Sequence, residues 1–275
     1  MKILSIIGAS TFGNTTEVMR YFKLQLEKCG GYEFEDLYLQ DHKIDFCTGC
    51  HNCIMLGEEK CPHYLTVKEI EDKMLQADGV ILATPGYMFS VSGIMKNFLD
   101  HVAYNCHRPK YFGKKIFLIS SCTKWQEDGV FIPMKTWAQG AGFDLCGSMY
   151  IDMMPFPYSE SELEKRRNKV NEAAFSFDKI LKTKTEIKPE FSRIMIFHAF
   201  RTMSAMFPKV MQADYRYFSD KKAYDKNSKW YIPAKIPFFK NFMAGIIEKK
   251  MKSSIMSMVD QEKSEKADGV FRNKL

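Results

Sequence analysis

Short apolar segments alternate with longer amphipathic segments through the first part of the chain, up to about residue 153. The runs "KILSIIG", "GVILATP" and "KIFLISSC" are nearly continuous in Ile, Leu and Val, which is typical of strands covered on both faces. In "YEFEDLYL" apolar and polar residues alternate, as in a strand nearer an edge of a sheet. "CGSMYIDM" supplies a fifth strand. The pattern predicts five strands at residues 2–8, 32–39, 79–85, 115–122 and 146–153.

Helical segments are expected between and after these strands, at residues 14–29, 67–76, 92–104, 131–139 and 159–181. Alternating strands and helices favour an α/β fold with an open parallel sheet and helices on both faces. Five strands fit the flavodoxin-like, doubly wound order, in which a ligand binds at the carboxyl ends of the strands near the switch point. We therefore expect a site built from three loops, at residues 9–16, 85–92 and 121–129.

Composition narrows the class of protein. Of the 275 residues, 45% are hydrophobic and 27% are charged, which indicates a globular protein with a substantial core. The apolar stretch in the opening "MKILSIIGAS" is too short for a signal peptide. No apolar run in the sequence approaches the roughly 20 residues that span a bilayer. We expect a cytoplasmic protein whose eight cysteines are reduced thiols or metal ligands rather than disulfides.

The net charge of +7 is concentrated in the last third of the chain. Residues 1–188 carry 23 basic against 24 acidic residues, whereas residues 189–275 carry 17 against 9. No helix-turn-helix pattern, zinc-finger spacing or RNA-binding motif accompanies this charge, so we expect no nucleic-acid partner.

The first predicted loop, "GASTFGNTTEV", leads from a strand into a helix through small and hydroxylic residues. Backbone N–H groups at a helix start bind anions without a lysine, and hydroxyl and amide groups can assist. The loop suits a phosphate monoester, and it lacks both the nucleoside triphosphatase and the dinucleotide glycine motifs. The same residue types also cap helices, so capping alone is the alternative. The candidate ligands are Ser10, Thr11, Asn14, Thr15 and Thr16.

The second loop carries the most specific signal. Pro85 and Gly86 end a strand, and Tyr87, Met88 and Phe89 then place large planar and soft groups at the switch point. Together with "GASTFGNTTEV", the stretch "TPGYMFSVSGIMKNFLDH" resembles the NADPH-dependent FMN reductase group of flavodoxin-like proteins. The resemblance covers about residues 1–182.

This resemblance implies that the first loop holds the FMN phosphate and that the Pro-x-Tyr loop lines the isoalloxazine ring. Ser121, Cys122 and Thr123, which follow the fourth strand, are then expected at the pyrimidine side. The first loop is one residue shorter than the usual form of the group, which leaves open whether Ser10 or Thr11 meets the phosphate.

The resemblance also implies an FMN-dependent oxidoreductase that takes a hydride from NADH or NADPH and reduces a small-molecule or protein acceptor. Because the cofactor carries the chemistry, no general acid or base is assigned. The alternative is a flavodoxin-type electron carrier that docks redox proteins without a nicotinamide site of its own.

Four cysteines, Cys47, Cys50, Cys53 and Cys61, lie in the short segment "CTGCHNCIMLGEEKC". They resemble the compact cysteine run of the iron-sulfur flavoproteins, which would ligate a 4Fe-4S cluster. His51 and His63 would also suit zinc, and metal-free thiols that pack or switch are a third interpretation. The sequence leaves these three open.

The remaining residues, 189–275, form a second predicted domain after a flavodoxin-like domain at residues 1–188. Segments 191–207 and 236–259 are rich in Phe and Met at near-helical spacing. We expect this helical extension to pack on the first domain or across a homo-oligomer such as a dimer, and partly to roof the flavin. Peripheral membrane contact by a basic amphipathic helix is the less favoured alternative.

Overall fold

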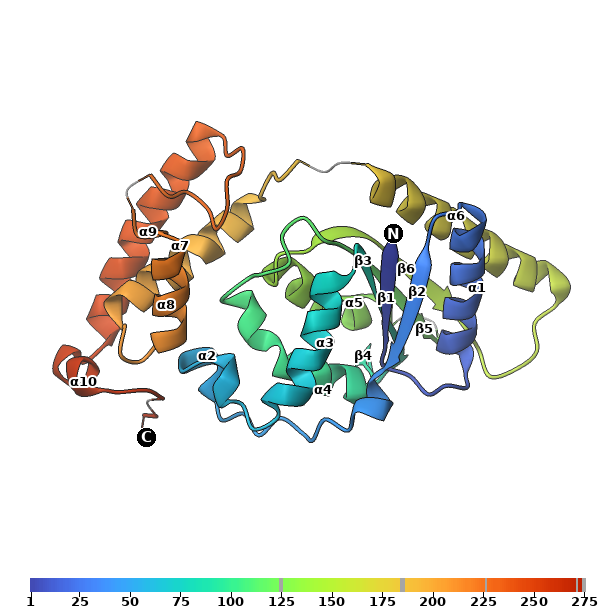
Figure 1. Cartoon of the computed structure of the whole chain (residues 1–275), viewed down its shortest axis with the longest axis horizontal. Helices are drawn as coiled ribbons and strands as arrows, with labels where there is room; N and C mark the ends of the chain where they lie inside the picture. Colours follow the sequence, from blue (N-terminus) through green and yellow to red (C-terminus); the bar gives the residue numbers. More distant parts are fainter. Residues whose placement is uncertain (124–125, 184–185, 226, 271, 274–275) are drawn as a thin grey trace. The chain divides into compact units, whose positions relative to one another are not determined.

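The computed structural model describes residues 1–123, 126–183, 186–225, 227–270 and 272–273 (Figure 1). The chain divides into two compact units. The first comprises Met1–Cys47, Leu65–Ala103 and Lys110–Thr185. The second comprises Thr48–Tyr64, Tyr104–Pro109 and Glu186–Leu275. The cysteine-rich segment after Cys47 therefore belongs to the same unit as the C-terminal helices.

A parallel sheet in the order β2-β1-β3-β5-β6 forms the centre of the first unit. The flavodoxin-like fold with its five-stranded parallel sheet is thus confirmed. A two-residue strand, β4, was not predicted and pairs antiparallel with the end of β3. The strands are β1 Lys2–Ile7, β2 Glu33–Tyr38, β3 Gly79–Tyr87, β4 Ser90–Val91, β5 Lys115–Cys122 and β6 Asp144–Asp152.

Helices cover both faces of the sheet, with α1 and α6 on one side and α3, α4 and α5 on the other (Figure 1). Under α1 and α6, the rings of Phe22, Phe117 and Phe177 pack together, and the ring centroids of each pair lie 5.1–6.3 Å apart. On the other side Trp137 packs against Phe98 and Phe143. The helices of this unit are α1 Asn14–Lys28, α3 Tyr64–Gln76, α4 Gly93–His101, α5 Glu127–Gly140 and α6 Glu160–Lys182, with the 3-10 turn η1 Leu39–His42.

Two boundaries differ from the prediction in ways that shape the site. The second predicted loop is mostly strand, because β3 continues to Tyr87 and turns back through β4. Helix α5 begins at Glu127 rather than at residue 131, despite Pro133 in its interior. Both changes place regular backbone close to the ends of β3 and β5.

The second unit consists of helices and 3-10 turns around an aromatic core. The ring of Phe197 contacts those of Phe218, Trp230 and Tyr231, all of which are buried. Its elements are α2 Asn52–Met55, η2 Glu58–Lys60, η3 Ala103–Cys106, α7 Phe191–Met206, α8 Gln212–Asp220, α9 Phe238–Met258 and α10 Gln261–Lys266. None of the helices described is both long and apolar enough to cross a membrane.

Candidate functional site

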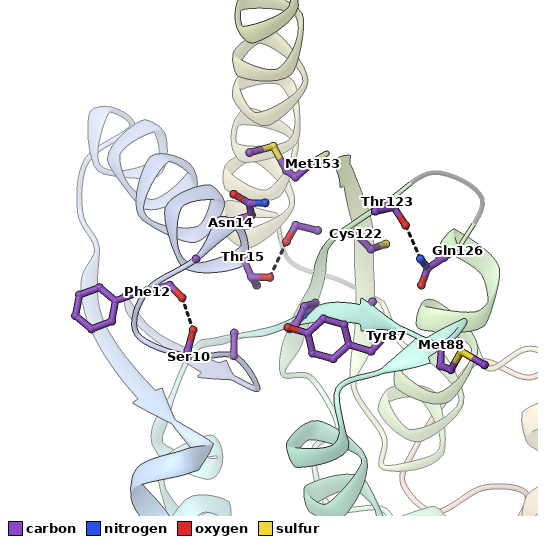
Figure 2. A pocket seen from close by; sticks show the side chains of 15 residues that line it. Ser10, Phe12, Asn14, Thr15, Tyr87, Met88, Cys122, Thr123, Gln126 and Met153 are labelled. Atoms are coloured by element: carbon purple, nitrogen blue, oxygen red, sulfur yellow. Dashed lines mark hydrogen bonds between the residues drawn. The ribbon is translucent and has the colours of Figure 1, made fainter. Parts of the chain in front are cut away.

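A cavity of about 380 Å³ opens in the first unit at the carboxyl ends of β1, β3 and β5 (Figure 2). This is where a parallel sheet of this order places its ligand. Among the described residues that line it, none carries a formal charge at neutral pH. The lining residues are Ala9, Ser10, Phe12, Gly13, Asn14, Thr15, Pro85, Gly86, Tyr87, Met88, Ser121, Cys122, Thr123, Gln126 and Met153.

The start of α1 forms one wall of this cavity. Gly13 precedes the helix with a φ of 139°, a conformation that favours glycine, and within the described chain no side chain caps the first N–H groups. These N–H groups and the positive end of the helix dipole are suited to an anion. The neighbouring hydroxyl of Thr15 lies 2.6 Å from that of Ser121, which ties the helix start to the end of β5 (Figure 2).

Ten of the thirteen residues predicted to bind the cofactor line the cavity, and three do not. Thr11 and Phe89 are exposed beside it. The hydroxyl of Thr16 is directed back into the loop and donates to the carbonyl of Ser10 at 2.7 Å. The prediction omitted Ala9, Phe12, Gly13, Gln126 and Met153. Gln126 follows the fourth predicted strand and Met153 is the last residue of the fifth, so the rule that ligands gather at strand ends indicates their region but not their identity.

The hairpin between β3 and β4 forms the opposite wall. Its two-residue turn has positive φ at both Met88 (50°) and Phe89 (57°), as in a type I′ turn, although neither residue is glycine. Such a conformation is strained for large side chains. The turn leaves Met88 91% exposed and Tyr87 62% exposed at the mouth of the cavity. The strained turn therefore presents large apolar groups where a planar ligand would lie.

Close packing holds this hairpin against the start of α5. A Cβ atom added to Gly129 would lie 1.9 Å from the carbonyl oxygen of Phe89, so only glycine allows the observed approach. The side chain of Gln126 donates to the hydroxyl of Thr123 at 2.6 Å (Figure 2). Residues 124–125, in the third predicted loop, lie outside the described residues.

The described residues that line the cavity contribute dipoles rather than formal charges. Burial raises the pKa of the Cys122 thiol above its usual value, which keeps this thiol protonated at neutral pH. Burial also raises the pKa of the Tyr150 hydroxyl, which donates to the carbonyl of Thr123 behind the cavity wall. Cys122 therefore contributes a neutral thiol to the cavity wall.

The cysteine loop is divided between the two units. Cys47 ends a segment of the first unit, where its N–H donates to the side chain of Asn97 at 3.0 Å. Cys50, Cys53 and Cys61 belong to the second unit. All eight cysteines are among the described residues, and none is in a disulfide. Within the described chain, the Sγ atoms of Cys50, Cys53 and Cys61 do not all lie within 4.8 Å of one another.

Comparison with known proteins finds a family model that matches the N-terminal part of the chain. Residues 1–133 match the family described as NADPH-dependent FMN reductase. An iron-sulfur flavoprotein of Archaeoglobus fulgidus is 25% identical over 228 residues, which cover 80% of this chain and 99% of the relative. An iron-sulfur flavoprotein of Methanocaldococcus jannaschii is 38% identical over 101 residues, which cover 36% of this chain and 51% of the relative.

The fold also matches solved structures. An NAD(P)H:quinone oxidoreductase from Methanothermobacter marburgensis superimposes with a TM-score of 0.51 at 18% identity, covering 65% of this chain and 97% of that protein. At this identity the likeness concerns the fold alone.

Proposed function

We propose that this chain, whose residues 1–133 match the family described as NADPH-dependent FMN reductase, is an FMN-dependent NAD(P)H oxidoreductase that reduces an acceptor. The observation that carries the proposal is the cavity at the strand ends, whose described lining residues are all uncharged and which has an uncapped helix start in its wall. This arrangement suits a phosphate monoester attached to a planar ring, because dipoles bind the phosphate and large exposed side chains flank the ring.

The phosphate end of FMN would lie against the start of α1. The N–H groups of the first turn, with the side chains of Ser10, Asn14 and Thr15, are the proposed donors. Ser10 lines the cavity whereas Thr11 does not, which favours Ser10 of the two candidates left open by the sequence. A lysine is unnecessary because several dipoles can share the charge of the phosphate.

The ring would lie between the β3–β4 hairpin and the end of β5. Pro85, Gly86 and Tyr87 would contact it from one side, and the backbone of residues 121–123 would face its polar edge. When bound, FMN supplies the capacity to accept a hydride and to release electrons singly or in pairs. The chain's own residues bind and orient the ring and limit the access of water.

We further propose that Cys47, Cys50, Cys53 and Cys61 hold a 4Fe-4S cluster that transfers single electrons. The support is the cysteine spacing and the description of two relatives as iron-sulfur flavoproteins. Protein purified without oxygen should contain about four iron atoms per chain, and a serine at any of these positions should lower that content. One tightly held zinc instead of iron would establish the zinc interpretation, and neither metal would leave only packing or thiol switching.

The test of the flavin site is a double substitution, Asn14→Ala with Thr15→Ala. We expect FMN affinity, measured by fluorescence titration, to fall about tenfold or more because two donors are lost. Thr11→Ala is the matched control, since Thr11 is in the same loop but outside the cavity lining. Unchanged affinity in the double variant would refute the assignment.

A second measurement tests the reaction. The FMN-loaded protein should oxidise NADPH or NADH with a soluble quinone as acceptor and no other protein present. If it accepts electrons only from a reduced partner protein, the chain is a flavodoxin-type carrier and the proposal of a nicotinamide-dependent activity is wrong.

A further inference from the structure

Two arginines of the second unit contact the main chain of the cysteine loop. The guanidinium of Arg108 donates to the carbonyl of Cys53 at 2.6 Å and to that of Ile54 at 2.8 Å. Arg216, on α8, donates to the carbonyl of Leu56 at 2.6 Å. These carbonyls lie in and just after α2, a single helical turn whose last carbonyls have no partner within the turn. The arginines therefore fix the backbone that carries Cys53.

Arg108 is itself held by Asp214. The Arg108 guanidinium donates to the Asp214 carboxylate, and their side chains are 6% and 0% exposed. Nδ1 of His107 lies 2.8 Å from the other carboxylate oxygen, and the His107 ring stacks on Phe200 with centroids 3.9 Å apart. A buried guanidinium is costly unless a charged partner compensates it. Glu58 also contacts this guanidinium, at 3.2 Å, but its side chain is 35% exposed, so Asp214 is the buried carboxylate of the two. The position of Arg108, and with it the two loop carbonyls, thus depends mainly on Asp214.

We propose that Asp214 is a positioning residue for the cysteine loop. Acting through Arg108, it fixes the backbone around Cys53 and so holds the thiols of Cys50, Cys53 and Cys61 in a defined arrangement. A main role of the C-terminal helices is then to support this loop. The part that concerns a metal cluster rests on the proposed function, whereas the part that concerns the loop does not.

A purely structural role for this ion pair would predict a different result. If Asp214 only stabilised the helical unit, its loss would expose every thiol of that unit together. Cys106 belongs to the same unit, and burial raises the pKa of its thiol to about 11. It therefore reports on the integrity of the unit, while the loop cysteines report on the loop.

The experiment measures the alkylation rate of each cysteine by iodoacetamide, with mass spectrometry, in reduced full-length protein treated with a chelator. In Asp214→Asn we expect Cys50, Cys53 and Cys61 to react on the order of tenfold faster, with Cys106 unchanged. Asp220→Asn, at the exposed end of the same helix, is the matched control. Unchanged loop rates, or a rise at Cys106 equal to that of the loop, would overturn the proposal.

Arg216→Ala serves if Asp214→Asn does not fold. Arg216 is exposed and holds only one of the three loop carbonyls, so we expect a smaller rise in the same cysteines, on the order of threefold. No rise in this variant would overturn the premise that arginine contacts with the loop carbonyls position the cysteines, and with it the role proposed for Asp214.

Iron content, measured in parallel without the chelator, separates this inference from the proposed function. Loss of iron with retained FMN in Asp214→Asn is the expected result. If the wild-type protein holds no iron, the proposal of a 4Fe-4S cluster is wrong. The alkylation rates still decide the role of Asp214 in that case. A loosened loop with unchanged iron would overturn the link between positioning and metal binding.

Discussion

The cavity of the first unit and the cysteine-loop support of the second show two different ways to hold a functional segment. The described lining of the cavity is uncharged, and its shape follows from strand ends, a helix start and a tight turn. The loop support instead depends on a buried ion pair, Arg108 with Asp214. The first arrangement is sensitive to backbone shape, and the second is sensitive to single charges.

The largest effect should come from removing the cation of the buried pair. Arg108→Met leaves the Asp214 carboxylate buried without its arginine, and we expect the second unit to lose about 3–5 kcal/mol of unfolding free energy. Hydrogen exchange in α7 and α8, compared with that in the sheet strands, measures the loss within that unit. FMN affinity should be retained.

The double variant Arg108→Met with Asp214→Leu is the control for that prediction. Because both buried charges of the pair are removed together, it should recover much of the lost stability. A double variant as unstable as the single would mean that packing, not charge, is what Arg108 contributes.

In the first unit, we expect a steric clash with the backbone to be the corresponding destabilising change. Gly129→Ala would place a Cβ 1.9 Å from the carbonyl oxygen of Phe89, so we expect a loss of about 2–3 kcal/mol and weaker FMN binding. Gly93→Ala is the matched control, because no atom lies within 4 Å of the added Cβ. Fluorescence titration and thermal unfolding measure both variants, and equal behaviour of the two would contradict the close approach.

Acid should weaken the second unit through Glu248, which lies on α9. Burial alone would raise the pKa of this carboxyl, but hydrogen bonds from His198, Thr202 and Arg201 outweigh it and lower the pKa to about 2. A lowered pKa contributes stability above the unfolded value of about 4.5, and this stability is lost as the pH falls from there towards 2.

We expect this loss to be about 1–3 kcal/mol. Hydrogen exchange in α7 and α9 at successive pH values measures it. Glu248→Gln should remove this part of the acid dependence, and a variant as acid-sensitive as the wild type would refute the assignment.

The smallest expected effect is a gain in the stability of the first unit. Met88 has a φ of 50° and is 91% exposed, so Met88→Gly relieves backbone strain without losing buried contacts. We expect the first unit to gain about 1 kcal/mol, seen as a higher thermal midpoint. Met88→Ala, which keeps a Cβ, should show no such gain. Equal midpoints for the glycine and alanine variants would mean that the turn is not strained.

The sequence predicts the first unit well and the second poorly, for a physical reason. Continuous apolar runs such as residues 79–85 identify buried strands, and the rule that ligands gather at strand ends then locates the cavity. The β3–β4 hairpin was missed because its turn, Met88 and Phe89, has none of the usual turn residues. Arg108 and Asp214 were missed because a contact across 106 residues leaves no periodic pattern in the sequence.

The second unit is assembled from three separate stretches of chain, and this affects its order of folding during synthesis. Thr48–Tyr64 and Tyr104–Pro109 leave the ribosome well before Glu186–Leu275, which supplies Asp214. Domains fold as their residues emerge, and non-local contacts form late. The sheet of the first unit can therefore form while the cysteines still lack their support. A nascent chain whose first 188 residues have left the ribosome should already bind FMN while its loop thiols remain open to reagents.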